Sequence, residues 1–311
     1  MVGAFFLRSN GADFDPGEPL MQTLEKQSPG KVNLLLNLLG KRPDGFHELE
    51  TIFHPLRCFD ELAFSRGGVG VQLTCNRTDL PTDSRNLVHR AATAFFQAAR
   101  ISDGVRIHLT KHLPLAAGLG GGSSNAAITL LGLNELFDHP LTSSQLHALA
   151  AALGSDVNFF LQNQPALATG RGEKIEPLHE FPALRNAAFF LVHPGFGVST
   201  AWAYQALARF PTARNGIPGR AQRLITLLQT TDLATAGRAF YNSLEAPVLE
   251  KYPILALYQE FLRTHGAPAA LMSGSGSTTF ALFPDLNRAE AMLETFPAQF
   301  GRAGWMAAIP V

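Results

Sequence analysis

The chain has 311 residues, of which 46% are hydrophobic and 16% charged, and this composition is typical of a folded globular protein. The 25 basic and 25 acidic side chains cancel and no run of Lys or Arg occurs, so a nucleic-acid partner is not expected. No stretch approaches the roughly 18 apolar residues of a membrane span. The two cysteines, Cys58 and Cys75, are too few for a disulfide framework, so we expect a cytoplasmic protein.

The hydrophobic pattern of the chain changes near residue 28. Residues 1–27 show no hydrophobic period and are rich in Gly, Pro and acids, so we expect a loose leader. Residues 31–38 alternate in polarity and predict a strand with Lys31 and Asn33 on the same face. Pro-Asp-Gly at 43–45 predicts a turn. Short strands are expected at 61–65, 69–74 and 105–110, and a helix at 86–99 with Asn86 as its candidate N-cap.

Strands and helices interleave through the rest of the chain without a regular βαβ repeat, which predicts an α+β fold. We expect two domains, 28–185 and 186–311, with the boundary placed in residues 182–186. Helices are predicted at 126–137, 143–153, 157–161, 200–208, 219–228, 248–264 and 287–295, and strands at 188–192 and 278–283.

A glycine-serine segment before the helix at 126–137 is the most unusual feature of the sequence. Glycine allows a bulky ligand to approach the backbone, and a helix N-terminus offers unpaired N–H groups and partial positive charge, so the segment predicts a phosphate site. The alternatives are a flexible linker or a plain helix cap, but ordered apolar residues flank both sides. The Walker A, dinucleotide-binding and serine-hydrolase patterns are absent. The segment contains Gly118, Gly120, Gly121, Gly122, Ser123 and Ser124.

Residues 114–127 resemble the ATP-binding motif of the GHMP kinase superfamily, and the third glycine followed by Ser-Ser-Asn-Ala-Ala is most similar to its diphosphocytidyl-methylerythritol kinase branch. The resemblance covers about 28–311 and implies an ATP-binding domain like domain 2 of ribosomal protein S5, followed by a ferredoxin-like substrate-binding domain. This chain has Phe46 where the branch usually has Tyr. Further matching segments lie in order at 28–33, 40–49, 154–157, 193–200 and 273–276.

The resemblance implies ATP-dependent phosphorylation of the 2-hydroxyl of 4-diphosphocytidyl-2-C-methyl-D-erythritol, in the methylerythritol phosphate route to isoprenoid precursors. Two alternatives stay open: another GHMP kinase, of the mevalonate or homoserine type, and a non-catalytic nucleotide-binding sensor on the same fold. The segment 44–47 favours the first function, because mevalonate and homoserine carry no nucleobase to stack.

By the same resemblance, Asp156 is the base that takes the proton of the acceptor hydroxyl. Lys31 orients that hydroxyl and stabilises the transferred charge, and Asn33 contacts the substrate. From the residues alone, Asp156 could equally be the cap of the short helix at 157–161, and Lys31 a solvated lysine at a strand end. A general base is typically worth about 10²–10⁴ in rate.

The resemblance also implies how the acceptor binds. Phe46 stacks on the cytosine, His47 reads its hydrogen-bonding edge, and Tyr204 supplies a second ring. Stacking of a base on an aromatic side chain is worth about 1–3 kcal/mol. The alternatives are that Phe46 and Tyr204 are ordinary core or surface aromatic residues, and that Gly274 and Gly276 only form a tight turn between strands. The complete set of predicted substrate contacts is Asn33, Phe46, His47, Thr200, Tyr204, Gly274 and Gly276.

The cofactors implied are ATP and Mg²⁺, with the metal held chiefly by phosphate oxygens and by Ser124. Both partners are small molecules, with no nucleic acid and no membrane, and the oligomeric state is either a monomer or a homodimer. The predicted ATP contacts are Asn86, Lys111, Pro114, Gly118, Leu119, Gly120, Gly121, Gly122, Ser123 and Ser124.

Overall fold

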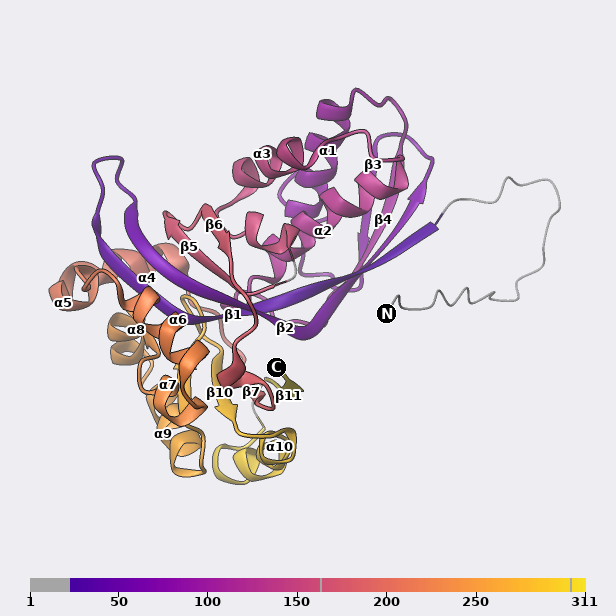
Figure 1. The fold of residues 1–311 in the computed structure, drawn as a ribbon. Coiled ribbons are helices and arrows are strands. Elements are labelled where there is room, and N and C mark those ends of the chain that lie inside the picture. Colours follow the sequence, from indigo (N-terminus) through magenta and orange to yellow (C-terminus); the bar gives the residue numbers. More distant parts are fainter. Residues whose placement is uncertain (1–22, 163, 303) are drawn as a thin grey trace.

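The computed structural model describes residues 23–162, 164–302 and 304–311, which form two β-sheets with helices packed around them (Figure 1). No helix in these ranges is both long and apolar enough to cross a membrane. The seven-stranded sheet contains β1 (Thr23–Lys41), β2 (His47–Arg66), β3 (Val71–Cys75), β4 (Val105–Thr110), β5 (Ala166–Gly170), β6 (Lys174–Pro177) and β8 (Tyr241–Asn242). The four-stranded sheet contains β7 (Ala188–His193), β9 (Ala269–Met272), β10 (Thr279–Phe283) and β11 (Trp305–Pro310).

The helices interleave with the strands along the chain. The α-helices are α1 (Leu87–Ala99), α2 (Gly121–Leu136), α3 (Ser143–Leu153), α4 (Thr200–Ala206), α5 (Pro211–Arg214), α6 (Arg220–Thr230), α7 (Leu233–Gly237), α8 (Glu245–Lys251), α9 (Ile254–Thr264) and α10 (Leu286–Phe300). Three short 3₁₀ helices are η1 (Asn158–Leu161), η2 (Pro182–Leu184) and η3 (Leu207–Arg209).

Two long antiparallel strands, β1 and β2, run through the middle of the molecule (Figure 1). A turn at the predicted Pro-Asp-Gly joins them: the Arg42 amide donates to the Phe46 carbonyl at 2.7 Å, and Gly45 has φ of +87°. This conformation suits glycine because it has no Cβ. One continuous ribbon therefore carries both Lys31, in the middle of β1, and Phe46, at the turn.

Helices α1 and α2 cover one face of the seven-stranded sheet, and α3 packs against both of them (Figure 1). Helix α2 buries residues such as Ala126, Leu130 and Leu133 in a core shared with the sheet. Gly132 allows α2 to pack closely against β2, since a Cβ on Gly132 would lie 2.7 Å from the ring of Phe64. This packing fixes the direction of α2 and therefore the position of its N-terminus, which follows the glycine-serine segment.

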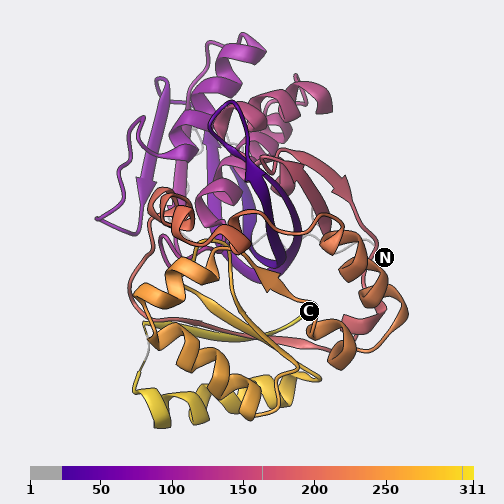
Figure 2. The same ribbon diagram turned by 90° about the vertical axis from the view of Figure 1, so that its left-hand side faces the viewer.

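The four-stranded sheet has the order β11-β7-β10-β9, and all its pairs are antiparallel. Helices α9 and α10 lie against one face of this sheet (Figure 2), where Phe190 and Phe296 are fully buried. On the other face, Phe189 joins a core that contains Leu34 of β1 and Leu224 of α6. Because this second core includes β1, the two sheets are packed together rather than independent.

The predicted α+β class is confirmed, but several element boundaries differ from the predictions. The leader was expected to end at residue 27, yet β1 begins at Thr23, because Leu24 packs on the core of the first sheet and pairs with Phe64. Residues 1–22 lie outside the described residues. The helix predicted at 248–264 is two helices, α8 and α9, separated at Pro253, where proline cannot continue the backbone hydrogen bonding. Strands β5, β6, β8, β9 and β11 were not predicted.

The change from the first sheet to the second falls between β6 and β7. Strand β8 nevertheless returns to the first sheet, where Tyr241 and Asn242 pair in parallel with Leu35 and Leu36 of β1. The division into domains 28–185 and 186–311 stays a prediction, and β8 is an element that any such division must accommodate.

Candidate active site

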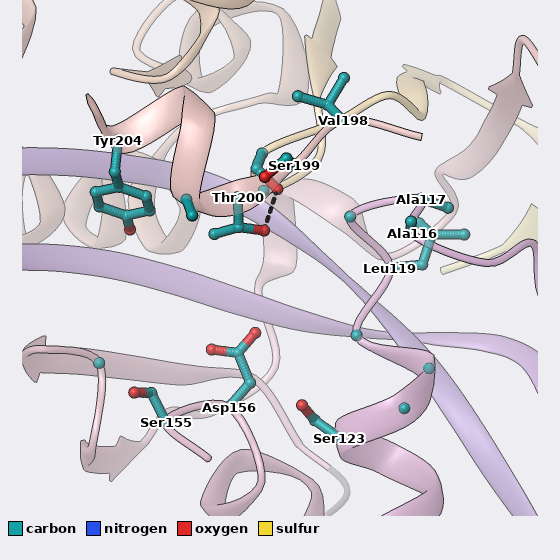
Figure 3. A pocket seen from close by; sticks show the side chains of 18 of the residues that line it. Ala116, Ala117, Leu119, Ser123, Ser155, Asp156, Val198, Ser199, Thr200 and Tyr204 are labelled. Carbon is teal, nitrogen blue, oxygen red and sulfur yellow. Dashed lines mark hydrogen bonds between the residues drawn. The ribbon is translucent and has the colours of Figure 1, made fainter. Parts of the chain in front are cut away.

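A cleft of about 1360 Å³ runs between β1, β2, the start of α2, α4 and the loop after β9. Typical ligand pockets occupy roughly 300–1,000 Å³, so this cleft has room for two small molecules side by side. Figure 3 shows Ser123, Asp156 and Thr200 approaching it from three different elements. The predicted residues that line the cleft are Lys31, Asn33, Phe46, His47, Asn86, Lys111, Pro114, Gly118, Leu119, Gly120, Gly121, Gly122, Ser123, Asp156, Thr200, Tyr204 and Gly274.

The glycine-serine segment forms the N-terminus of α2, which begins at Gly121. Gly120, at the cap position, has φ of +71°, and no side chain caps the helix. The first N–H groups of a helix have no partner within it, so those of α2 remain for a ligand in the cleft. Together with the positive end of the helix dipole, they make a site suited to phosphate.

Two glycines in this segment are required by close contacts as well as by their φ angles. A Cβ on Gly118 would collide with the carbonyl oxygen of Ser273, in the loop after β9. A Cβ on Gly120 would lie 2.8 Å from the Phe160 ring and 3.0 Å from Cγ of Lys31. The phosphate site, Lys31 and the loop after β9 are therefore packed directly against one another.

Lys111 lies beside this segment in a buried polar cluster. Its Nζ donates to Asp60, whose side chain is fully buried, and to Asn125 Oδ1 at 3.1 Å. Asp60 also accepts the backbone amides of His112 and Leu113, each at 2.9 Å. The Asn125 amide in turn donates to Asp60 at 3.0 Å. The cluster thus connects β2, which carries Asp60, to the start of α2, which carries Asn125.

Two predicted contacts do not reach the cleft. Ser124 is fully buried, and its Oγ accepts a hydrogen bond from Ser28 at 2.8 Å, so it does not line the cleft as predicted for a phosphate or metal ligand. Successive helical residues point in directions about 100° apart, and Ser123 is the serine that faces the cleft. Gly276 is also absent from the lining: it packs against the Met272 side chain, while Gly274 and Ser275 line the cleft.

Lys31 and Asp156 face each other in the middle of the cleft. Lys31 is 4% exposed, and its Nζ lies 3.7 Å from Asp156 Oδ2 and 2.6 Å from Asn33 Oδ1. Burial lowers the pKa of Lys31 below the ordinary lysine value, while the carboxylate of Asp156 acts in the opposite direction. Asn33 is oriented by its own donation to Thr51 Oγ1 at 2.8 Å. The result is an acid–base pair whose lysine is buried and whose carboxylate, 37% exposed, opens to the cleft.

Aromatic side chains gather where the β1–β2 turn meets α4. The His47 and Tyr204 rings lie 5.3 Å apart at 46°. Phe46 is 54% exposed, and the Arg171 guanidinium lies 4.7 Å from its ring centre. Burial, with help from the charge of Lys41, lowers the pKa of His47, so its imidazole is neutral near pH 7. Burial and the nearby Asp156 raise the pKa of Tyr204. These rings offer flat apolar faces and a neutral hydrogen-bonding edge.

Thr200 and Asn86 both line the cleft. Thr200 begins α4, and its Oγ1 lies 2.8 Å from Ser275 Oγ, which joins α4 to the loop after β9 (Figure 3). Asn86 caps α1, as predicted, by accepting from the Val88 amide at 3.0 Å, and its Nδ2 donates to the Pro81 carbonyl. Asn86 therefore fixes the chain at the glycine-loop end of the cleft.

Comparison with known proteins identifies the family. The model of the GHMP kinases N terminal domain matches residues 86–171, and that of the GHMP kinases C terminal domain matches 224–302. A 4-diphosphocytidyl-2-C-methyl-D-erythritol kinase from a Synechococcus species is 40% identical over 288 residues, covering 90% of this chain and 91% of the relative. The kinase of that name from Syntrophotalea carbinolica is 38% identical, covering 90% and 95%. The chain belongs to the 4-diphosphocytidyl-2-C-methyl-D-erythritol kinase family.

Solved structures agree with this assignment and confirm the resemblance drawn from the motifs. A crystal structure of 4-(cytidine 5'-diphospho)-2C-methyl-D-erythritol kinase is 34% identical, covers 93% of this chain and 100% of the other, and superposes with a TM-score of 0.75. A homoserine kinase from Cytophaga hutchinsonii reaches a TM-score of 0.73 with coverage of 97% and 98%, but at 19% identity it shows the shared fold alone.

Several cleft or supporting residues of this GHMP kinase were missed by sequence reasoning. Asp60 sits in a strand of ordinary composition, and its pairing with Lys111 spans 51 residues, so no local pattern marked it. Asn125 lay inside the recognised motif but its side chain was not considered. Arg171 and Arg214 line the cleft from a turn and from α5, and neither belongs to a recognised segment.

Proposed function

We propose that this kinase transfers the γ-phosphoryl group of ATP to the 2-hydroxyl of 4-diphosphocytidyl-2-C-methyl-D-erythritol. The observation that carries the proposal is the placement of Lys31 and Asp156, 3.7 Å apart, in the cleft that the uncapped N-terminus of α2 and the aromatic turn also line. A phosphate-binding end and a base-binding end in one cleft, with an acid–base pair between them, suit transfer between two nucleotides. The names of the relatives support the same acceptor.

The chemistry proposed for these residues is direct phosphoryl transfer. Asp156 takes the proton of the acceptor hydroxyl, whose oxygen attacks the γ-phosphorus as the bond to the β-phosphate oxygen breaks and ADP leaves. Lys31 stabilises the negative charge that moves onto the phosphoryl oxygens, and its donation to Asn33 fixes its direction. Such transfers depend mainly on positioning and charge stabilisation, and the close packing of Lys31 against Gly120 supports the positioning.

The acceptor is proposed to place its cytosine among Phe46, His47 and Tyr204. A neutral imidazole has one N–H donor and one acceptor, which matches the mixed donor and acceptor edge of cytosine. The His47 and Tyr204 rings are in contact, and the exposed Phe46 ring keeps its π face although it lacks the tyrosine hydroxyl. Gly274 and Thr200 line the path from this base site to Asp156.

The proposed ATP site is the N-terminus of α2 with Ser123. Mg²⁺, when bound, supplies positive charge to the β- and γ-phosphates. Phosphate oxygens and the Ser123 hydroxyl, which lines the cleft, would hold it. The cytoplasmic location and the monomer or homodimer state stay predictions.

The test is ADP release by the purified protein with ATP, Mg²⁺ and one acceptor at a time: the cytidyl-linked substrate, mevalonate or homoserine. We expect release with the cytidyl substrate alone, reduced by about 10²-fold or more in Asp156→Asn. Activity with another acceptor would keep the kinase and overturn the cytosine site. Binding of ATP without release for any acceptor would favour the nucleotide-sensor alternative.

A further inference from the structure

The loop after β9 forms part of the cleft, and β9 is the edge strand of its sheet. An edge strand presents backbone groups that no neighbouring strand pairs. Here side chains pair with them. Glu245 accepts the Met272 amide at 2.7 Å, and Arg263 donates to the Ala270 carbonyl at 2.6 Å. The Met272 carbonyl accepts from Asn242 Nδ2 at 2.8 Å.

Asn242 extends this pairing into the cleft loop. The same Nδ2 also donates to the Gly274 carbonyl at 2.8 Å, and Oδ1 accepts the Leu244 amide at 2.9 Å. An asparagine NH₂ has two hydrogens, so both are used on these two carbonyls. The side chain is 2% exposed and does not line the cleft. Asn242 therefore fixes the carbonyls on both sides of Ser273.

The loop held in this way touches both halves of the proposed site. A Cβ on Gly274 would lie 3.4 Å from Lys31 Nζ and 3.5 Å from Asn33 Oδ1. The neighbouring Ser273 hydroxyl donates to the Gly118 carbonyl at 2.9 Å. A small shift of the loop would therefore change the surroundings of Lys31 and of the glycine segment together.

The backbone of Asn242 is anchored to the strand that carries Lys31. Asn242 pairs with Leu36 in β1, and the next residue, Ser243, donates its amide to the Leu36 carbonyl at 2.8 Å. The Ser243 hydroxyl accepts the Leu38 amide at 3.0 Å. Asn242 thus spans from β1 of the first sheet to the loop after β9 of the second.

We propose that Asn242 is a positioning residue for the phosphoryl transfer, because it sets the Ser273–Gly276 loop against Lys31 and Gly118. It touches no substrate and acts through Gly274. The inference rests on the proposed function and adds to it a residue that none of the recognised segments contains. A displacement of about 1 Å at a reacting centre can cost about 10²-fold in rate, so a loosened loop has a measurable kinetic effect.

The test compares Asn242→Asp with Asn134→Asp. Asn134 is a matched control, because its buried side chain also holds a loop, donating to the Leu141 carbonyl and accepting the Leu141 amide, yet lies outside the cleft lining. Each aspartate places a carboxylate against a backbone carbonyl. We expect both variants to lose thermal stability, but only Asn242→Asp to lose kcat/KM for the acceptor, by about 10-fold or more.

The pH profile separates positioning from simple destabilisation. A protonated aspartate regains one donor, so the rate of Asn242→Asp relative to the wild type should rise as the pH is lowered from 8 toward about 5. Equal kinetic loss in both variants, or none in either, would overturn the proposal. If Asn242→Asp does not fold, the uncharged Asn242→Ser is measured against Asn134→Ser with the same expectation for kcat/KM.

Hydrogen exchange keeps the inference separate from the proposed function. Amides of the Ser273–Gly276 loop and of the glycine segment at 118–122 should exchange faster in Asn242→Asp than in Asn134→Asp. This measurement needs no substrate. A wild type without kinase activity would overturn the proposed function, whereas unchanged exchange in both segments would overturn the role of Asn242.

Discussion

Two buried lysines border the same cleft and differ in their partners. Lys111 donates to Asp60, which is fully buried and accepts two backbone amides as well. Lys31 instead faces Asp156 at 3.7 Å, and that carboxylate is 37% exposed. A charge whose partner is equally buried is already neutralised, whereas one whose partner opens to the cleft can interact with a ligand. Burial alone therefore does not distinguish the two lysines, but the exposure of the partner carboxylate does.

Replacing Lys111 by methionine should cause the largest loss of stability. It leaves Asp60 as a buried charge without its cation, a change that typically costs about 3–5 kcal/mol. The free energy of unfolding, measured with urea, should fall by about that amount. In the double variant Asp60→Asn/Lys111→Met most of the stability should return. A double variant as unstable as the single one would contradict the pairing.

Replacing Lys31 by methionine should reduce catalysis strongly without reducing stability. We expect kcat to fall by about 10²–10³, or about 2.7–4 kcal/mol, the usual effect of removing one donor to transition-state charge. Stability should be equal or higher, because the burial of Lys31 disfavours its charged form. Steady-state kinetics and thermal unfolding of the one variant test both points. A fall in stability as large as that of Lys111→Met would mean that Lys31, like Lys111, contributes mainly to the stability of the fold.

A smaller effect should follow from Ser28→Ala, which probes the cluster around Lys111 from its far side. The Ser28 hydroxyl donates to Ser124 and accepts from the Asn125 amide, each at 2.8 Å. Losing one buried partner typically costs about 1–3 kcal/mol. Unfolding in urea should show this loss, compared with Ser144→Ala on the exposed surface of α3. A cost no greater than that of the surface control would contradict the role of Ser28 in the cluster.

The smallest effect concerns pH. The pKa of Lys31 lies below 10.5, so its ammonium loses its proton at a lower pH than an ordinary lysine and the rate should fall there. In the window between the two values the unfolded chain binds more protons, so Lys31 contributes to stability that rises with pH. Profiles of kcat/KM and of Tm against pH check both directions. In an active Lys31→Arg variant, whose side chain stays charged, the loss of kcat/KM at alkaline pH should move to higher pH. If this loss stays at the same pH, it belongs to the titration of another group.

The sequence predicted best what depends on neighbouring residues. Strand alternation placed Lys31 and Asn33 on one face, and their side chains are hydrogen bonded. The Pro-Asp-Gly turn, the cap at Asn86 and the helix after the glycines are all local patterns, and the structure contains each of them. These features follow from backbone geometry within a few residues.

The sequence could not predict features that depend on distant pairing or on helix phase. Asp60 meets Lys111 across 51 residues, and Asn242 meets Gly274 across 32. Both Ser123 and Ser124 were predicted to contact ATP, and the helix was predicted to begin at residue 126. Because α2 begins at Gly121 and includes both serines, they point in different directions: Ser123 lines the cleft and Ser124 is buried. The leader was extended to residue 27 because the pairing of Thr23 with Ser65 becomes visible only in the folded sheet.

The continuous cleft of about 1360 Å³ has a consequence for the order of events during turnover. We expect ATP and the acceptor to occupy it together, so a ternary complex should form before either product leaves, and initial-rate plots should intersect rather than run parallel. A single inhibitor that joins an adenine and a cytosine through a phosphate chain would occupy both ends. Its second end would bind at a high effective concentration, so its affinity should exceed that of either half.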